Sequence, residues 1–295
     1  MAIKEVYIVH HSHTDVGYTD LQEQVIYNQA HNIRTAVALM KEGIEKGDCR
    51  RDLKWNCETW YCVEQFLKIA SPVEKVDFFN LVKRGNIGLS ATYLNFNDLA
   101  DCGYLNRKTA EMVDICKANG VDLKTAMNAD INGISLGARD VLIGNGIEFL
   151  YTNIHTHHGM YPLYQNQKPY FWENEQGKRL LVWNGEHYNL GNALGIVFNK
   201  NVNFMTESYF GSATAEGPME NLYQNLTESI KEYVDNGYPY DFYITSVSGV
   251  FSDNAPVNPA IAQTVEAFNE RYGSEVTLKM VSLQELYELI RGKVA

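Results

Sequence analysis

The sequence predicts an α/β fold, namely a seven-stranded, mainly parallel α/β barrel with helices outside, forming one domain over residues 1–295. Short strand-like segments alternate with amphipathic helical segments along the chain, as the crossover connections of parallel strands require. The length of 295 residues also suits one α/β barrel of roughly 250 residues with insertions. An open doubly wound sheet is the alternative, but no Gly-x-Gly-x-x-Gly motif follows the first strand to indicate a dinucleotide site.

Strands are predicted where short apolar runs lie between turn residues. In chain order they cover residues 5–9, 53–56, 86–91, 124–128, 147–152, 240–245 and 276–281. Residues 169–172 and 179–183 also have strand character, but a turn around Gly177 joins them, so we interpret them as a β-hairpin. We assign this hairpin and a long irregular loop to an insertion after the fifth strand, at about residues 155–217.

Helices are predicted from apolar residues three and four positions apart and from capping signals at the helix ends. In chain order they cover residues 26–47, a segment that ends at residue 85, and residues 107–119, 135–144, 218–234, 259–271 and 282–290. Ser71 with Glu74 forms a capping box within the second helix, and Ser282 with Glu285 forms one at the start of the last helix. Pro218 suits a first helical turn.

Composition excludes several classes of protein. The chain has 25 Lys and Arg against 36 Asp and Glu, a formal net charge of -11, with no dense basic cluster, so nucleic acid is not an expected partner. The 5 cysteines include no Cys-x-x-Cys pair, which argues against a disulfide framework or a thiolate zinc site. Without a signal peptide or an apolar run of ~20 residues, we expect a cytoplasmic protein with no membrane partner.

The stretch from His11 to Asp15 places potential metal ligands directly after the first strand. Side chains alternate along an extended segment, so His11, His13 and Asp15 point to one side. Two imidazoles and a carboxylate suit Zn²⁺ or a similar cation, and Gly17 lets the backbone turn away after the ligands. A polar strand end with hydrogen-bonded histidines is the alternative.

Chemically active side chains also follow the later strands, which is where barrel enzymes place their sites. They are Glu58 after the second strand, Asn95 and Asp98 after the third, Asp130 after the fourth, His155, His157 and His158 after the fifth, and Asp253 after the sixth. Of the 8 histidines, all but His31 lie after a strand or in the irregular loop. Such grouping is typical of a metal site.

Four segments resemble glycoside hydrolase family 38, the α-mannosidases. The segment 11–18, His-Ser-His-Thr-Asp-Val-Gly-Tyr, is similar to the family's His-Ser-His-Asn-Asp-Pro-Gly-Trp signature, and segment 55–58 is similar to its Trp-x-x-Glu segment. Segments 130–135 and 252–256 resemble those around the family's nucleophile and acid/base. The resemblance runs from residue 5 to about residue 290 and implies the family's N-terminal catalytic domain, a seven-stranded α/β barrel.

This resemblance implies that His13, Asp15 and Asp130 bind one Zn²⁺ ion, that Asp130 is also the nucleophile, and that Asp253 is the acid/base. The family's fourth ligand is a histidine beyond the region matched here, as are its helical and β-rich domains. We therefore expect a water or a local substitute, with His155 or His157 favoured because they follow a strand directly. His11 is expected to orient a neighbouring group. The expected substrate-binding residues are Tyr18, Glu58, Asn95, Asp98, His158 and His187.

The match departs from the family at several positions. Val16 and Tyr18 stand in place of the signature's Pro and Trp, Ile131-Asn132 in place of Pro-Phe, and Ile134 in place of a histidine. An arginine expected near residue 153 is also absent. Substrate contacts are therefore expected to differ. For Glu58, a strand-end carboxylate that bonds backbone amides is the second interpretation.

The function predicted from these features is that of a zinc-dependent retaining glycoside hydrolase, α-mannosidase-like, which cleaves mannosides or oligosaccharides through a covalent glycosyl–Asp intermediate. Such an enzyme needs an ionised nucleophile and a protonated acid, roles that zinc beside Asp130 and a less solvated Asp253 would support. A metal-dependent deacetylase of N-acetyl sugars is one alternative, and a non-catalytic metal- and sugar-binding domain is another. A homo-oligomer is also among the states that the sequence allows.

Overall fold

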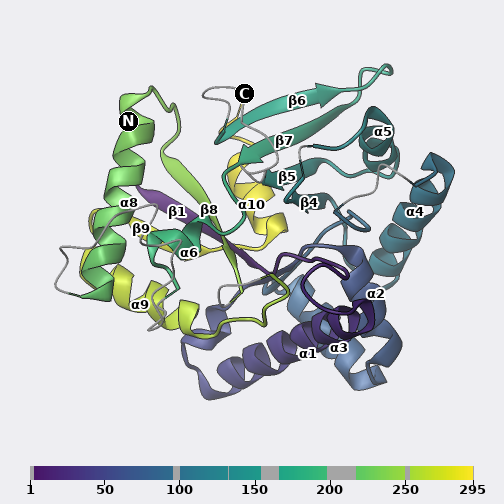
Figure 1. The fold of residues 1–295 in the computed structure, drawn as a ribbon, viewed down its shortest axis with the longest axis horizontal. Helices are drawn as coiled ribbons and strands as arrows, with labels where there is room; N and C mark the ends of the chain where they lie inside the picture. The colour runs from purple at the N-terminus through teal and green to yellow at the C-terminus, as the bar shows by residue number, and fades with distance from the viewer. Residues whose placement is uncertain are drawn as a thin grey trace.

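The computed structural model describes residues 3–95, 100–131, 133–153, 166–197, 217–249 and 253–294. Nine strands lie in this part of the chain: β1 (Glu5–His11), β2 (Trp55–Cys57), β3 (Ile87–Leu89), β4 (Thr125–Ala129), β5 (Phe149–Asn153), β6 (Lys168–Glu173), β7 (Arg179–Gly185), β8 (Phe242–Ser248) and β9 (Thr277–Met280). They form two sheets, one ordered β3-β2-β1-β8 with β9 on β1, the other ordered β4-β5-β7-β6 (Figure 1). The α/β class is confirmed, but the seven-stranded barrel is not, because the described strands number nine and form two separate ladders.

All strand pairs are parallel except β6 with β7. Strand β1 is central to its sheet: β8 pairs along its whole length, β9 pairs at its start and β2 at its end. Parallel pairing brings the carboxyl ends of β1, β2 and β8 to one edge, and those of β4, β5 and β7 to the matching edge of the second sheet. The expected site residues follow these ends.

The predicted hairpin exists as β6 and β7, but it is not an insertion. Strand β7 pairs in parallel with β5, from Phe149 opposite Leu181 to Asn153 opposite Gly185. Its segment from Leu180 to Trp183 is buried, so β7 is an internal strand and only β6 lies outside it. The turn at Gly177 identified the local antiparallel partner, whereas pairing with β5 depends on a segment about 30 residues earlier in the chain.

Helices cover the two sheets (Figure 1). They are α1 (Gln22–Lys46), α2 (Trp60–Ile69), α3 (Pro72–Lys83), α4 (Cys102–Ala118), α5 (Leu136–Gly144), α6 (Leu190–Leu194), α8 (Pro218–Asp235), α9 (Ala260–Tyr272) and α10 (Leu283–Ile290), with a 3₁₀ turn at Cys49–Asp52. Both predicted capping boxes are present. The segment predicted as one helix up to residue 85 is two, because Ser71 is extended and Pro72 supplies no amide to continue α2.

The sheets meet along two seams where side chains replace a strand ladder. Between β3 and β4, the Thr125 hydroxyl donates to the Leu89 carbonyl at 2.8 Å. Between the second sheet and β8, Tyr151 and Ser246 share a hydroxyl hydrogen bond of 2.8 Å, and Gln167 Nε2 donates to the Ile244 carbonyl at 2.5 Å. One hydrophobic core nevertheless continues across both sheets. Among the described helices, none is long and apolar enough to cross a membrane.

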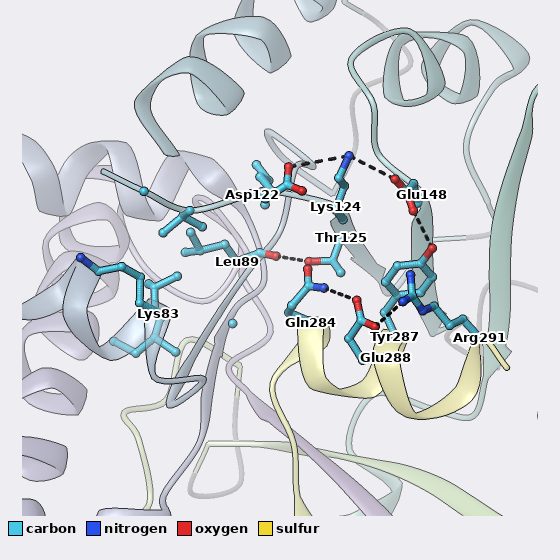
Figure 2. A pocket seen from close by; sticks show the side chains of 16 residues that line it. Lys83, Leu89, Asp122, Lys124, Thr125, Glu148, Gln284, Tyr287, Glu288 and Arg291 are labelled. Carbon is cyan, nitrogen blue, oxygen red and sulfur yellow. Dashed lines mark hydrogen bonds and ion pairs between the residues drawn. The ribbon is translucent and has the colours of Figure 1, made fainter. Parts of the chain in front are cut away.

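A cavity of about 570 Å³ lies at the opposite end of the strands from the expected site residues, at the starts of β3 and β4 beside α10 (Figure 2). Its polar side chains bond to one another. Lys124 lies 3.1 Å from Glu148, and the Tyr287 hydroxyl donates to Glu148 at 2.7 Å. This region provides matched control positions for variants of the site.

Candidate metal centre and active site

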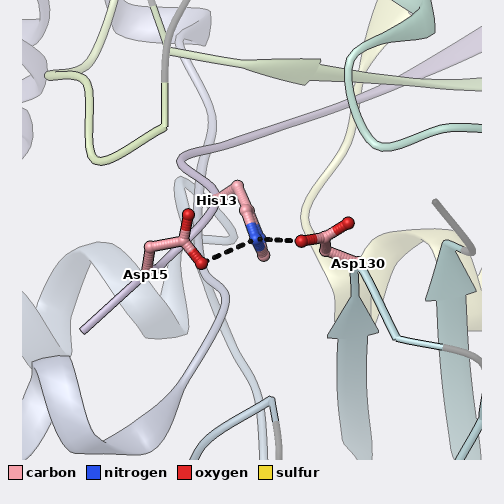
Figure 3. A group of neighbouring side chains, drawn as sticks. All are labelled: His13, Asp15 and Asp130. Carbon is pink, nitrogen blue, oxygen red and sulfur yellow. Dashed lines mark ion pairs between the residues drawn. The ribbon is translucent and has the colours of Figure 1, made fainter. Parts of the chain in front are cut away.

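His13, Asp15 and Asp130 meet at the carboxyl ends of β1 and β4 (Figure 3). One potential ligand atom of each residue lies within 4.8 Å of the others. His13 Nε2 is 3.5 Å from Asp15 Oδ1 and 3.4 Å from Asp130 Oδ2. The structure therefore brings together the three residues for which the resemblance to family 38 implied a common cation, although they come from different sheets.

The loop after β8 forms hydrogen bonds to the loop after β1, which carries His13 and Asp15. The Asn254 backbone N donates to the His13 carbonyl at 2.8 Å, and the Asn254 side-chain Nδ2 donates to the Asp15 carbonyl at 2.9 Å. The His13 backbone N donates to Ser248 Oγ at 3.0 Å. Asn254 has a left-handed backbone with φ 57°, a conformation that asparagine tolerates better than most residues. Asp253 is thereby placed beside the ligand loop.

Asp130 turns away from β4 through a left-handed backbone with φ 61°. Its backbone N still donates to the Asn153 carbonyl at 2.9 Å, so the residue stays attached to the neighbouring strand. Positive φ at a residue other than glycine is uncommon and is found preferentially at functional positions. The turn directs the Asp130 carboxylate toward His13 (Figure 3).

The residues present fit a divalent cation. His13 Nε2 is buried and makes no hydrogen bond to the described residues, although two carboxylate oxygens face it. Separations of 3.4 and 3.5 Å are long for a hydrogen bond but leave room for an ion with bonds of ~2.0–2.2 Å to nitrogen and oxygen. One imidazole and two carboxylates are a donor set that zinc accepts, and three protein ligands are typical of catalytic zinc sites.

Charges around His13 favour a positive group at this position. Burial lowers the pKa of His13, but the negative charges of Glu58, Asp130 and Asp15 outweigh burial and raise the pKa well above its usual value. Because a metal ligand must be unprotonated, a cation competes with this proton for Nε2.

Glu58 lies behind His13 rather than in the open site. Its side chain is fully buried, and its Oε1 accepts from His13 Nδ1 at 2.9 Å. Burial raises the pKa of Glu58, but His13 and His11 hold the pKa well below its usual value, so the carboxylate is ionised. The sequence allowed two interpretations of Glu58, contact with substrate or hydrogen bonding to backbone amides. Among the described residues, one backbone amide bonds this carboxylate, Thr14 N at 3.1 Å.

Tyr188 is a site residue that the sequence analysis did not single out. Its ring packs on the His13 ring with centroids 4.4 Å apart, and its hydroxyl donates to Asp253 Oδ1 at 3.2 Å. Its backbone carbonyl accepts from His11 Nε2 at 3.0 Å. Burial raises the pKa of Tyr188, which keeps the hydroxyl protonated as a donor. The only sequence signal was an aromatic residue beside His187 after a strand-like segment.

Asp253 has the surroundings expected of an acid. Burial raises its pKa above the usual value, and the charges of Asp15 and Glu58 act in the same direction, against opposing effects of His13 and Tyr188. A raised pKa favours the protonated form, in agreement with the expectation of a less solvated Asp253.

The other predicted site residues lie in varied places. Tyr18 is 86% exposed, Asn95 is buried and donates to Glu58, and His187 stacks on the Tyr188 ring with centroids 4.4 Å apart. His11 is buried and bonds Glu58, which agrees with an orienting role. The residues outside the described part of the chain are Asp98, His155, His157 and His158. Their roles, including the fourth metal ligand, stay predictions.

The histidine grouping includes one member outside the site. His10 is buried on the other side of β1, where its Nδ1 donates to the Lys54 carbonyl at 3.0 Å and its ring meets the Trp55 ring edge-on. Burial lowers the pKa of His10 to about 3, so it is a neutral core residue.

The fold and this cluster define an α/β domain with a histidine, two aspartates and a third, protonatable aspartate at the ends of its strands. The family model described as the glycosyl hydrolases family 38 N-terminal domain matches residues 4–294. The chain therefore belongs to glycosyl hydrolase family 38, a family of glycosidases. No curated protein matches it in sequence.

Solved structures share the fold. An α-mannosidase from Enterococcus faecalis V583 has a TM-score of 0.68 at 14% identity, covering 99% of this chain and 30% of that chain. A family 38 protein from Enterococcus faecalis has a TM-score of 0.66 at 10% identity, covering 100% of this chain and 28% of that chain. A 4-α-glucanotransferase from Thermococcus litoralis has a TM-score of 0.52 at 13% identity, covering 98% and 40%. This chain thus spans less than a third of either Enterococcus protein.

Proposed function

We propose that residues 1–295 form a single catalytic domain of a zinc-dependent retaining glycoside hydrolase that cleaves α-mannosidic bonds. The observation that carries the proposal is the convergence of His13, Asp15 and Asp130 on one point, with Asp253 in the adjoining loop. Membership of family 38 supports the reaction class, and the name of the Enterococcus α-mannosidase supports the sugar.

In this proposal Asp130 is the nucleophile and Asp253 is the general acid/base. The Asp130 carboxylate attacks the anomeric carbon while Asp253 gives its proton to the leaving oxygen, which forms a glycosyl ester on Asp130. Asp253 then takes a proton from the water that hydrolyses the ester. When bound at His13, Asp15 and Asp130, zinc would hold carboxylate oxygens ionised and polarise sugar hydroxyls.

The remaining assignments are part of the same proposal. The substrate is a mannoside or oligosaccharide, and Tyr18 and His187 contact it together with Asp98 and His158; His155 or His157 completes the metal shell. All 5 cysteines are free, which supports a cytoplasmic location. Self-association is the other partner interaction to be tested.

The first prediction tests the nucleophile. Protein loaded with zinc is incubated with an aryl α-mannoside, and Asp130→Ala is expected to lose at least about 10³-fold in kcat/KM because no other group attacks the anomeric carbon. Asp253→Ala is expected to lose far less with a dinitrophenyl leaving group than with a sugar leaving group, because dinitrophenolate leaves without a proton. Asp52→Ala, at a position whose side chain is 74% exposed, is the control.

The outcomes separate the candidate functions. Wild-type activity in Asp130→Ala would exclude Asp130 as nucleophile. Acetate release from an N-acetyl sugar without glycosidic cleavage would identify a deacetylase, since its metal activates water for amide cleavage. Calorimetry showing zinc and mannose binding without turnover would identify a binding domain.

A further inference from the structure

Glu58 is the centre of a fully buried hydrogen-bond network beneath the proposed metal centre. Its Oε2 accepts from His11 Nδ1 at 2.5 Å, and its Oε1 accepts from His13 Nδ1 at 2.9 Å. Oε1 also accepts from Thr14 N and from Asn95 Nδ2. The side chains of Glu58, His11 and His13 are at most 1% exposed. Four protein donors thus satisfy this carboxylate.

The bond to His13 selects which ring nitrogen faces the site. An ionised carboxylate only accepts hydrogen bonds, so His13 must carry a proton on Nδ1. Nε2 is then the nitrogen that faces Asp15 and Asp130, where a cation can displace its proton. Carboxylate–histidine–metal arrangements of this kind fix the tautomer and the ring orientation of a metal ligand.

Asn95 extends the same network to the other side of the site. Its Nδ2 donates to Glu58, while its Oδ1 accepts from Ala129 N at 3.2 Å. Ala129 is the last residue of β4 and directly precedes Asp130. Glu58 is therefore linked on one side to the histidine ligand after β1 and on the other to the carboxylate ligand after β4, although β1 and β4 belong to different sheets.

We propose that Glu58 is a positioning residue for the metal centre: it sets the ring orientation of His13 and, through Asn95, the distance between His13 and Asp130 before the cation binds. His11 holds Glu58 in place from its other oxygen. The inference rests on the proposed function in taking His13, Asp15 and Asp130 as a cation site. Glu58 itself does not contact substrate, because its side chain is buried behind His13.

A role confined to fold stability would not need this set of partners. Only one of the four donors is a backbone amide, whereas two are imidazoles, one of them a proposed ligand. Burying a carboxylate is costly unless it is paired, and here the imidazoles of His11 and His13 pair with Glu58. Removing the charge of Glu58 is therefore expected to affect the orientation of these imidazoles more than the packing of the surrounding core.

The test measures zinc affinity directly, by competition with a chromophoric chelator, and needs no substrate. Glu58→Gln is expected to bind zinc 10–100-fold more weakly than wild type, the loss typical of such outer partners. Asn95→Ala is expected to fall between the two. The control Glu148→Gln removes a carboxylate at the opposite end of the strands and is expected to keep wild-type affinity (Figure 2). Circular dichroism and unfolding temperature of the metal-free proteins report folding.

A second measurement distinguishes positioning from stability alone. In the zinc-loaded wild type, imidazole nitrogen chemical shifts are expected to show the proton of His13 on Nδ1 with Nε2 toward the ion, and this preference is expected to weaken in zinc-loaded Glu58→Gln. Zinc affinity equal to wild type in a folded Glu58→Gln protein would overturn the inference. If Glu58→Gln does not fold, unchanged affinity in Asn95→Ala would overturn it. Wild-type protein that binds no zinc would instead overturn the proposed function and the inference together.

Discussion

Asp130 and Asp253 are two aspartates whose surroundings separate their expected charge states. Asp130 lies 3.4 Å from His13 Nε2, beside a group that carries positive charge or a cation. Asp253 lies in the loop after β8, and burial raises its pKa. A retaining glycosidase needs one carboxylate ionised and the other protonated at the same pH. The different surroundings of the two aspartates therefore suit Asp130 to the role of nucleophile and Asp253 to the role of acid.

Tyr188→Phe is a test of how Asp253 is tuned. The variant keeps the ring on His13 but removes the hydroxyl bond to Asp253, which favours the ionised carboxylate and lowers its pKa. Loss of this hydrogen bond therefore raises the pKa of Asp253. Because the acid must be protonated, the alkaline limb of kcat/KM against pH is expected to move to higher pH, by up to about one unit for a bond worth ~1 kcal/mol.

Hydrolysis of an aryl α-mannoside measured across the pH range checks this expectation. Tyr287→Phe, which loses a hydroxyl bond to Glu148 at the other end of the strands, is the control. A limb that stays in place or moves to lower pH would contradict the tuning of Asp253 by Tyr188.

Single residues were predictable from sequence where a local rule applied. His13, Asp15 and Asp130 each follow a strand, so the strand-end rule placed them among the candidate site residues. The resemblance to family 38 then implied that these three share one cation. The partners of Glu58 and the position of Tyr188 were not predictable. His11 and Tyr188 are separated by 177 residues, and nothing local in either segment encodes that contact.

At the scale of elements, capping chemistry predicted helix ends well because it acts within one turn. Ser71 and Ser282 cap α3 and α10 as expected. Strand pairing was less predictable. The sequence of β7 is compatible both with the outer strand of a local hairpin and with an internal strand beside β5. The two seams, where side-chain hydrogen bonds of Gln167 and of hydroxyl groups replace a strand ladder, leave no period in the sequence.

The turn between β8 and α9 provides a prediction at this scale. Asn254 combines a left-handed backbone with side-chain bonds to the Asp15 carbonyl and the Thr19 hydroxyl. Asn254→Gly removes only the side-chain bonds, whereas Asn254→Ala also strains the backbone. We expect both to lower the free energy of unfolding, Ala by about 1 kcal/mol more than Gly, and both to weaken zinc binding because the Asp15 loop loses its support.

Urea unfolding and chelator competition on the two variants measure these effects. Asn28→Ala, in the exposed part of α1, is a control for loss of an asparagine side chain. Equal stability of the Gly and Ala variants would show that the left-handed backbone is not retained, and unchanged zinc affinity in both would separate this turn from the metal centre.

For the whole molecule, the seam between β7 and β8 holds the two sheets together and contains a carboxyl group that responds to pH. Glu186 directly follows β7, and its backbone carbonyl accepts from Asn153 Nδ2 at 2.6 Å. Burial raises the pKa of its carboxyl to about 7, the charge of Glu232 acts in the same direction, and the bond from Asn166 opposes both. Protonated Glu186 therefore suits this seam better than ionised Glu186.

Stability is consequently expected to fall as pH rises through this range. The pKa of Glu186 is about 7 in the folded protein against an ordinary value of 4.5, so the folded state binds the proton more tightly than the unfolded chain does. The favourable contribution is complete below pH 4.5, declines between pH 4.5 and about 7, and is absent above that. Because Glu186 is partly exposed, we expect a change of about 1–2 kcal/mol. Urea unfolding of wild type and Glu186→Gln at pH 5 and pH 8 measures it: the variant should lose this part of the pH dependence, while Glu175→Gln in the β6–β7 turn should retain it. An equal pH dependence in wild type and Glu186→Gln would show that the seam does not sense pH through this residue.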